Sequence, residues 1–250
     1  MPRQNRALRA REKLNRTASL VKLQHARKAL RAQADPRKAR THRTFFKETA
    51  DVFLGVSAPR LRRVAREFHE LPLRDVRALM NSNIHDERSL AHAILVLKYR
   101  KGDTAAQKEI FEFYIRNRKF IRSWDGVDDS APYIAGPYLL KRSKKLLYAL
   151  ARSPRLWDRR IAMVTTWWFI RQGEVRDALN IARILLNDRE DLIHKAAGWM
   201  LREAGKRDLH ALEGFLKAHH KSMPRTMLRY AIERFPERKR KAYLAGEIDN

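Results

Sequence analysis

Apolar side chains in this chain recur at the period of an α-helix in one segment after another, with short polar connections between the segments. Leu61, Val64, Ala65 and Phe68 follow Pro59 at the spacing that places them on one stripe of a helix. Alternation of apolar and polar residues, which indicates strands, is scarce, so we expect an all-α protein. The same pattern predicts further helices over residues 73–80, 86–99, 139–151, 156–170, 175–186, 192–204, 209–219 and 226–235.

The number and spacing of these segments favour a repeat architecture. About a dozen helices would form about six antiparallel pairs, with one pair for every ~35–45 residues. This spacing is typical of a HEAT-like α-solenoid, whose concave face would form a basic cleft. A compact helical bundle is the alternative, because the residues show no crisp repeat. Lys101-Gly102-Asp103 breaks the helical pattern, and Thr104 is expected to cap the helix that follows.

The charge of the chain indicates an anionic partner. The 55 Lys and Arg residues exceed the 28 Asp and Glu residues and give a formal net charge of +27. Such an excess attracts phosphate polymers or anionic membrane surfaces and does not specify a fold. No apolar run approaches the length of a spanning helix, so we expect a cytoplasmic protein, associated with the nucleoid in a bacterium.

Several classes of site are excluded by what the sequence lacks. The chain has no cysteine, which excludes disulfides, thiolate nucleophiles, iron–sulfur clusters and cysteine zinc sites. It has no phosphate-binding glycine loop and no paired histidines at a metal-binding spacing. We therefore expect neither a metal nor another cofactor.

Residues 1–44 form a basic segment that we expect to be separate from a helical domain over residues 45–250. The segment carries 14 Lys and Arg residues against Glu12 and Asp35, yet the remainder of the chain is also basic. A solvated and partly helical or flexible tail is one interpretation, and an arm that binds nucleic acid is another. An organelle import leader is a third.

The segment Trp124-Asp125-Gly126-Val127-Asp128 is unusual in so basic a chain, because it brings two carboxylates and an indole within one helical turn. Trp124 and Asp128 are four residues apart and share a helix face. We expect Asp125 either to lie at the start of a helix or to support Trp124 and Asp128 without itself contacting a ligand. The alternative is that Trp124 belongs to the core and that one of the two aspartates caps the next helix.

Arg160 lies beside a stripe of core residues formed by Trp157, Ile161, Val164 and Trp168. A flanking arginine usually extends its guanidinium to water. It can instead bind a phosphate or hold a carboxylate through two parallel hydrogen bonds. The sequence leaves these alternatives open.

Two further groups combine cations with aromatic rings or a helix start. Lys195, Trp199 and Arg202 share one helix face, where an indole between two cations suits contact with a nucleotide. Arg225 and Arg229 are four residues apart at a helix start, where phosphate binding is expected unless they simply face water.

With these residues identified, the chain resembles the DNA alkylation repair family, the AlkD-type glycosylases built from HEAT-like repeats. The resemblance runs from about residue 45 to 244 and implies an α-solenoid that binds duplex DNA. By motif it places the catalytic carboxylate on Asp128, flanking indoles on Trp124 and Trp199, and an active-site guanidinium on Arg160, or on Arg159 if the register differs by one. The matching stretches are 53–56 (FLGV), 123–128 (SWDGVD), 157–160 (WDRR) and 195–203 (KAAGWMLRE).

The resemblance also implies an activity. Such enzymes hydrolyse the N-glycosidic bond of N3- or N7-alkylated purines in double-stranded DNA without flipping the base, and we expect a monofunctional enzyme that acts as a monomer. A non-catalytic HEAT-repeat protein for damaged or branched DNA is the alternative. Relatives carry a tyrosine near the start of the domain, where this chain has Phe45 and Phe46, and the sequence does not show which of them replaces it.

Overall fold

The protein is all-helical in the residues that its computed structural model describes, 20–46 and 50–247. Within these ranges the only pairing of β type is an isolated bridge between Val52 and Ile84. The all-α prediction is therefore confirmed. The chain divides into two compact units, Met1–Ile121 and Arg122–Asn250, and each is described by itself.

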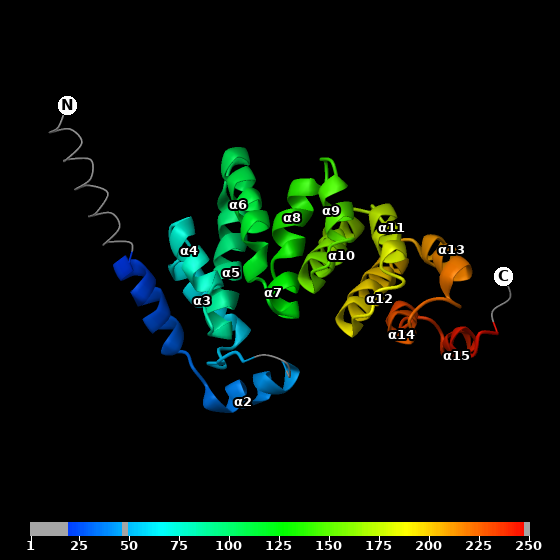
Figure 1. The fold of residues 1–250 in the computed structure, drawn as a ribbon, viewed down its shortest axis with the longest axis horizontal. Helices are drawn as coiled ribbons and strands as arrows, with labels where there is room; N and C mark the ends of the chain where they lie inside the picture. The colour runs from blue at the N-terminus through cyan, green and yellow to red at the C-terminus, as the bar shows by residue number, and fades with distance from the viewer. Residues whose placement is uncertain (1–19, 47–49, 248–250) are drawn as a thin grey trace. The chain divides into compact units, whose positions relative to one another are not determined.

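In the first unit, α5 is the central helix. It packs against α3, α4 and α6, and its residues are buried on most of its circumference (Figure 1). The unit consists of a helical stretch over residues 20–31, α2 (Pro36–Phe45), α3 (Ala58–Glu67), α4 (Leu73–Met80), α5 (His85–Lys101), α6 (Thr104–Asn117) and the 3-10 turn η1 (Arg118–Phe120).

The start of α6 corrects one detail of the sequence analysis. Asp103 is the N-cap residue, and its carboxylate accepts a hydrogen bond from the backbone N–H of Ala106 at 2.9 Å. Thr104, which was predicted to cap the helix, is its first residue. A carboxylate at the N-cap reaches an unpaired N–H of the first turn and also faces the positive end of the helix dipole.

In the second unit, α10, α12 and α14 lie side by side in one row, and α8, α9, α11 and α13 pack against that row (Figure 1). The elements are α7 (Trp124–Asp128), α8 (Ala131–Leu139), α9 (Lys145–Leu150), α10 (Leu156–Arg171), α11 (Arg176–Ile184), α12 (Asp191–Gly205), α13 (Leu209–His219), α14 (Arg225–Ala231) and α15 (Glu237–Ala245).

Two predicted helices of this unit are shorter than the apolar pattern indicates. The stretch 139–151 is divided, because α8 ends at Leu139 and α9 begins at Lys145. The residues between them include the polar run Lys141-Arg142-Ser143-Lys144, which has no apolar side chain to bury. The stretch 226–235 ends as a helix at Ala231.

Two glycines allow neighbouring helices of the second unit to approach closely. A Cβ atom on Gly136 would lie 2.4 Å from Cβ of Trp168, where α8 meets α10. A Cβ atom on Gly198 would lie 2.5 Å from the carbonyl oxygen of Met227 and equally close to Cβ of Tyr230, where α12 meets α14. Larger residues at either position would force the helices apart.

A repeated local device starts α5, α10 and α12. In each case one residue, two positions before the N-cap, makes two hydrogen bonds. Its side chain accepts from the backbone N–H of the N-cap residue, and its backbone carbonyl oxygen binds the side chain of the residue four positions after the N-cap. Ser153 and Asp188, which open the second and third copies, are 35 residues apart, the period expected of a helical-pair repeat. The three sets are Ser82, Ile84 and Arg88; Ser153, Arg155 and Arg159; and Asp188, Glu190 and His194.

Candidate functional site

The second unit holds a forked ion pair between Asp128 and Arg160. Nε of Arg160 donates to Oδ1 of Asp128 at 2.9 Å, and Nη2 donates to Oδ2 at 2.8 Å. The third donor, Nη1, binds the carbonyl oxygen of Leu192 at 2.6 Å. Asp128 is the last residue of α7, Arg160 lies near the start of α10, and Leu192 near the start of α12. One guanidinium therefore joins three helices around a single carboxylate.

The pair is largely withdrawn from water, since the side chains of Arg160 and Asp128 are 6% and 16% exposed. Burial raises the pKa of Asp128 above its ordinary value, although the charge and hydrogen bonds of Arg160 oppose the rise. The nearby negative charge of Asp125, in the first turn of α7, adds to it. Arg160 thus favours the ionised form of a carboxyl group whose pKa is raised by burial.

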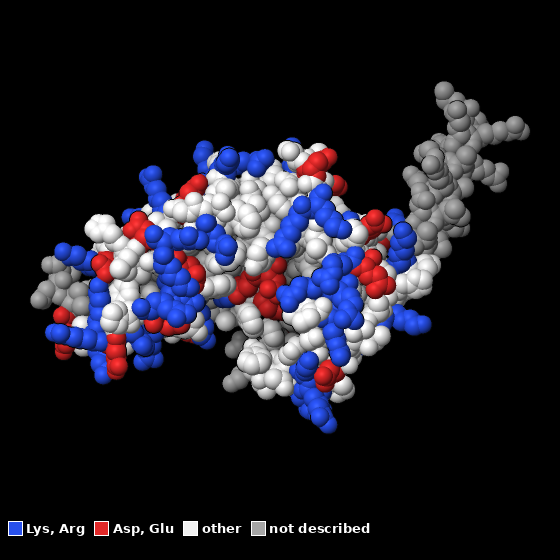
Figure 2. All heavy atoms as spheres, turned by 180° about the vertical axis from the view of Figure 1, so that it is seen from behind, with Lys and Arg blue, Asp and Glu red and all other residues white. Residues whose placement is uncertain are grey.

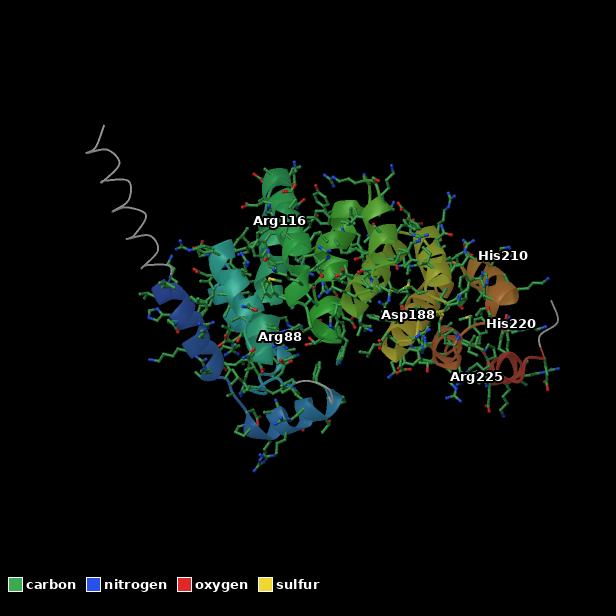
Figure 3. The ribbon with its side chains drawn as sticks, in the orientation of Figure 1. Arg88, Arg116, Asp188, His210, His220 and Arg225 are labelled. Carbon is green, nitrogen blue, oxygen red and sulfur yellow. The ribbon has the colours of Figure 1, made fainter. Side chains whose placement is uncertain are left out.

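The adjacent arginine has a different partner. Arg159 forks the carboxylate of Asp188, and its Nη1 binds the carbonyl oxygens of Ser153 and Pro154, both at 3.0 Å. Asp188 lies just before α12, where Figure 3 labels it. The structure therefore brings Arg160, and not Arg159, to Asp128. The sequence analysis missed Asp188, which carried no signal beyond its place in a polar connection.

The two indoles of the predicted site are both half-buried. Trp124 begins α7, one helical turn before Asp128, and Trp199 lies on α12, the helix whose start accepts a hydrogen bond from Arg160. Trp157 and Trp168 were expected in the core with Ile161 and Val164, but they too are only half-buried, whereas Ile161 and Val164 are inaccessible to solvent. The wide indoles extend from the edge of the buried stripe to the surface.

The cations expected to bind DNA differ in how far they are already paired. Lys195 forms an ion pair with Asp191 at 2.7 Å, and this hydrogen bond is the main cause of the raised pKa of Lys195. Arg202 binds both Glu203 and Glu233.

Arg225 and Arg229 of α14 are both exposed. Arg225, labelled in Figure 3, donates to the carbonyl oxygen of Leu244 at 2.7 Å. Arg229 forms no ion pair or hydrogen bond through its side chain within the described parts of the chain, so it is the most available of these cations.

Phe45 and Phe46 lie in the first unit and differ sharply in exposure. Phe45 ends α2 and is 65% exposed. Phe46 packs against Phe53 and His85, with ring centroids 5.3 and 4.6 Å apart. Phe45 is thus the ring available to a partner, whereas Phe46 belongs to an aromatic cluster.

The basic segment before residue 45 is helical where it is described. Ala26 and Leu30 are buried, and Arg27 and Arg31 both bind the buried carboxylate of Glu87, each at 3.1 Å. α2, in contrast, has no buried residue. The expectations for residues 1–19 lie outside the described residues. Lys and Arg side chains are spread over the face of the molecule drawn in Figure 2, with fewer Asp and Glu side chains among them.

The described residues contain no group of three or more His, Asp or Glu side chains placed to hold a metal ion. In the same ranges, no helix is long and apolar enough to cross a membrane. A pocket of about 370 Å³ between α11 and α13 is lined by residues such as Leu179 and Phe215, and none of the predicted site residues reaches it.

Comparison with known proteins places this geometry in context. A family model described as DNA alkylation repair enzyme matches residues 26–235. Among solved structures, a predicted DNA alkylation repair enzyme from Enterococcus faecalis is similar with a TM-score of 0.64 and 16% sequence identity, covering 82% of this chain and 98% of that one. No curated protein is similar enough in sequence to match the chain.

Proposed function

This chain belongs to the DNA alkylation repair enzyme family, and we propose that it is a monofunctional glycosylase that hydrolyses the N-glycosidic bond of N3- or N7-alkylated purines in duplex DNA. The observation that carries the proposal is the half-buried carboxylate of Asp128, oriented by two hydrogen bonds from Arg160. A carboxylate has about four lone-pair positions. The fork uses one on each oxygen, so the others remain for a water molecule or for a positive charge.

The chemistry of the substrate explains why one carboxylate suffices. A purine alkylated at N3 or N7 is cationic, so it departs with the bonding electrons and becomes neutral without a general acid. The sugar then develops oxocarbenium character at C1′, which the charge of Asp128 stabilises. Water adds to C1′ and its proton passes to Asp128. Most glycoside hydrolases need a second carboxyl group because their leaving groups are neutral before they depart.

Arg160 and the indoles have supporting roles in this proposal. Arg160 keeps Asp128 ionised against the cost of burial and fixes the direction of its oxygens. Trp124 and Trp199 present aromatic faces that stabilise positive charge on the base or sugar, each by about 0.5–2 kcal/mol. Substrate choice then follows the charge and instability of the lesion, without extrusion of the base into a deep pocket.

DNA binding in this proposal is mainly electrostatic, and the protein acts as a monomer in the cytoplasm. The net charge of +27 and the exposed cations Arg225 and Arg229 suit contact with the phosphate backbone. Phe45, Lys195 and Arg202 are further contacts, the last two after exchanging their carboxylate partners for phosphate. Phe46 contributes indirectly, because its packing on Phe53 and His85 holds the chain next to Phe45.

The test is to incubate the purified protein with duplex DNA containing 7-methylguanine and to detect the free base. We expect release by the wild type and none by Asp128→Asn, which should still bind the duplex. Unchanged release by this variant would overturn the assignment of Asp128.

A second function is favoured by one observation, because Arg160 binds both oxygens of Asp128, as in a purely structural ion pair. The protein would then be a non-catalytic binder of damaged or branched DNA. Tight binding without release of base from any methylated duplex would support this alternative.

A further inference from the structure

We propose that Tyr230 and Arg229 on α14 form a contact surface for the DNA strand beside the lesion, with the ring of Tyr230 against a sugar or base and Arg229 on a phosphate. This surface, the α14 edge, is not identified by the motifs around Asp128. The proposal rests on the proposed function for the identity of the partner. It concerns binding, however, and does not depend on base release.

Tyr230 is an exposed aromatic residue held on a closely packed helix. Its side chain is 36% exposed. Its backbone is fixed because α14 lies directly against Gly198 of α12, where a Cβ atom would be 2.5 Å from Cβ of Tyr230. The backbone that carries the ring therefore does not have to be ordered on binding.

The α14 edge adjoins the helix that holds the Asp128 site. Lys195 lies one turn before Gly198 and Trp199 on α12, the helix whose Leu192 carbonyl binds Arg160. The pKa of Lys195 is raised mainly by its hydrogen bond with Asp191, while Tyr230 adds to the rise and Arg160 opposes it. Gly198, which packs against Tyr230, and Leu192, whose carbonyl oxygen binds Arg160, lie on the same helix, so α12 connects the α14 edge to the Asp128 site.

The charges around the α14 edge favour an anionic partner. Arg229 directly precedes Tyr230 in the sequence and is exposed. Its guanidinium forms no ion pair with a carboxylate of the described residues. Two acids near this surface already have partners, since Asp191 of α12 binds Lys195 and Glu233, four residues after Arg229, binds Arg202. An exposed ring beside an unpaired cation is the combination that binds a nucleic acid strand, with stacking on the ring and phosphate on the cation.

The α8 helix offers a matched control. Tyr138 is half-buried and Arg142 lies over its ring at 4.3 Å, so it is another tyrosine–arginine pair in the same unit. α8 packs against α10, whereas the α14 edge packs against α12. Loss of a ring or a charge there should leave DNA binding unchanged.

The experiment measures the affinity for an unmodified duplex by fluorescence anisotropy over a range of salt concentrations. We expect Tyr230→Ala to weaken binding by about tenfold, which corresponds to about 1.4 kcal/mol and lies within the range for one stacked ring. Tyr230→Phe should keep the affinity within about twofold, because it retains the ring. Arg229→Gln should weaken binding and reduce the slope of log affinity against log salt by about one.

The controls Tyr138→Ala and Arg142→Gln should bind as the wild type does. Wild-type affinity in Tyr230→Ala and Arg229→Gln, or equal losses in the controls, would overturn the proposal, provided that circular dichroism shows each variant folded. Because the duplex is unmodified, this result is independent of base release. Failure of Asp128→Asn to lose activity would overturn the proposed function and leave the α14 edge standing.

Discussion

An arginine–aspartate fork in the first unit and the fork of the candidate site in the second use the same chemistry in different surroundings. In the first unit, Arg88 binds Asp51 with two donors and also donates to the carbonyl oxygen of Ser82 at 2.9 Å. In the second unit, Arg160 binds Asp128 with two donors and also donates to a carbonyl oxygen, that of Leu192. Both arginines lie near the start of a long buried helix, α5 or α10.

The groups around the two forks differ. Beside Arg88, each buried acid fixes a segment of chain. Asp86 accepts hydrogen bonds from the N–H groups of Leu54 and Val56, both at 2.8 Å. Glu87 takes both Arg27 and Arg31 from the N-terminal helix. The fork of the first unit is part of a closed structural network.

Beside Arg160, the acid has different neighbours. Within the described residues, Asp128 accepts hydrogen bonds from Arg160 alone, and the charge of Asp125 is close by. Half-buried Trp124 precedes it on α7. The comparison teaches that a buried arginine–aspartate fork does not by itself mark a site. What marks the second fork is the raised pKa of its carboxyl group, together with a second carboxylate and an indole beside it.

The largest expected effect on stability comes from breaking the first fork. Arg88→Met leaves the carboxylate of Asp51, only 10% exposed, without its cation. Loss of one partner of a buried pair costs about 3–5 kcal/mol. Arg160→Gln should cost less, because burial raises the pKa of Asp128 and so makes it easier for the unpaired carboxyl group to take up a proton. Urea denaturation followed by circular dichroism measures both, and equal losses would remove the distinction between the forks.

The second fork should instead control the pH dependence of base release. Arg160 holds the pKa of Asp128 down against burial, so Arg160→Gln should raise that pKa further. The ionised carboxylate is the active form, so release is lost as the pH falls through the pKa of Asp128. In the variant this loss should begin at a higher pH than in the wild type. The single-turnover rate against pH measures this shift, and Arg159→Gln, whose arginine binds Asp188, is the adjacent control. The same shift in both variants would argue for a general loss of structure.

A smaller effect is expected at Glu87. Glu87→Gln keeps the shape of the side chain and one acceptor but removes the charge that binds Arg27 and Arg31. We expect a loss of about 1–2 kcal/mol in the free energy of unfolding, with an unchanged single-turnover rate of base release. The same denaturation and release assays test it. A slower release in the folded variant would show that the first network reaches the chemistry.

Much of the helical architecture is predictable from the sequence, because apolar stripes set the helices directly. The segments 73–80 and 209–219 agree with α4 and α13 at both ends. The errors arise where polar side chains, and not the apolar stripe, set the end of a helix. Asp103 rather than Thr104 caps α6, and the run 141–144 ends a stripe that periodicity alone would continue. Local hydrogen bonding and polar connections override the hydrophobic pattern at such points.

The site is less predictable because it depends on which residues meet across helices. Residue spacing placed Trp124 and Asp128 on one helix face. It could not decide whether the guanidinium of Arg160 extends to water or binds a carboxylate. The charged run His85-Asp86-Glu87-Arg88 is buried at the start of α5, and sequence analysis overlooked it. Four consecutive polar residues on an otherwise apolar helix were a usable signal. The repeated hydrogen-bond pattern at the helix starts gave no usable signal. Serine or aspartate can accept the hydrogen bond before the helix, and arginine or histidine can bind the carbonyl oxygen, so the pattern has no fixed sequence.

The central claim is that Asp128 is the catalytic carboxylate, and one measurement tests it most directly. Single-turnover release of 7-methylguanine from duplex DNA is followed for the wild type and Asp128→Asn, with protein in excess and duplex binding measured in parallel. We predict that the variant retains binding and releases the base at least about a hundredfold more slowly. Release at the wild-type rate by the folded, DNA-bound variant would contradict the claim.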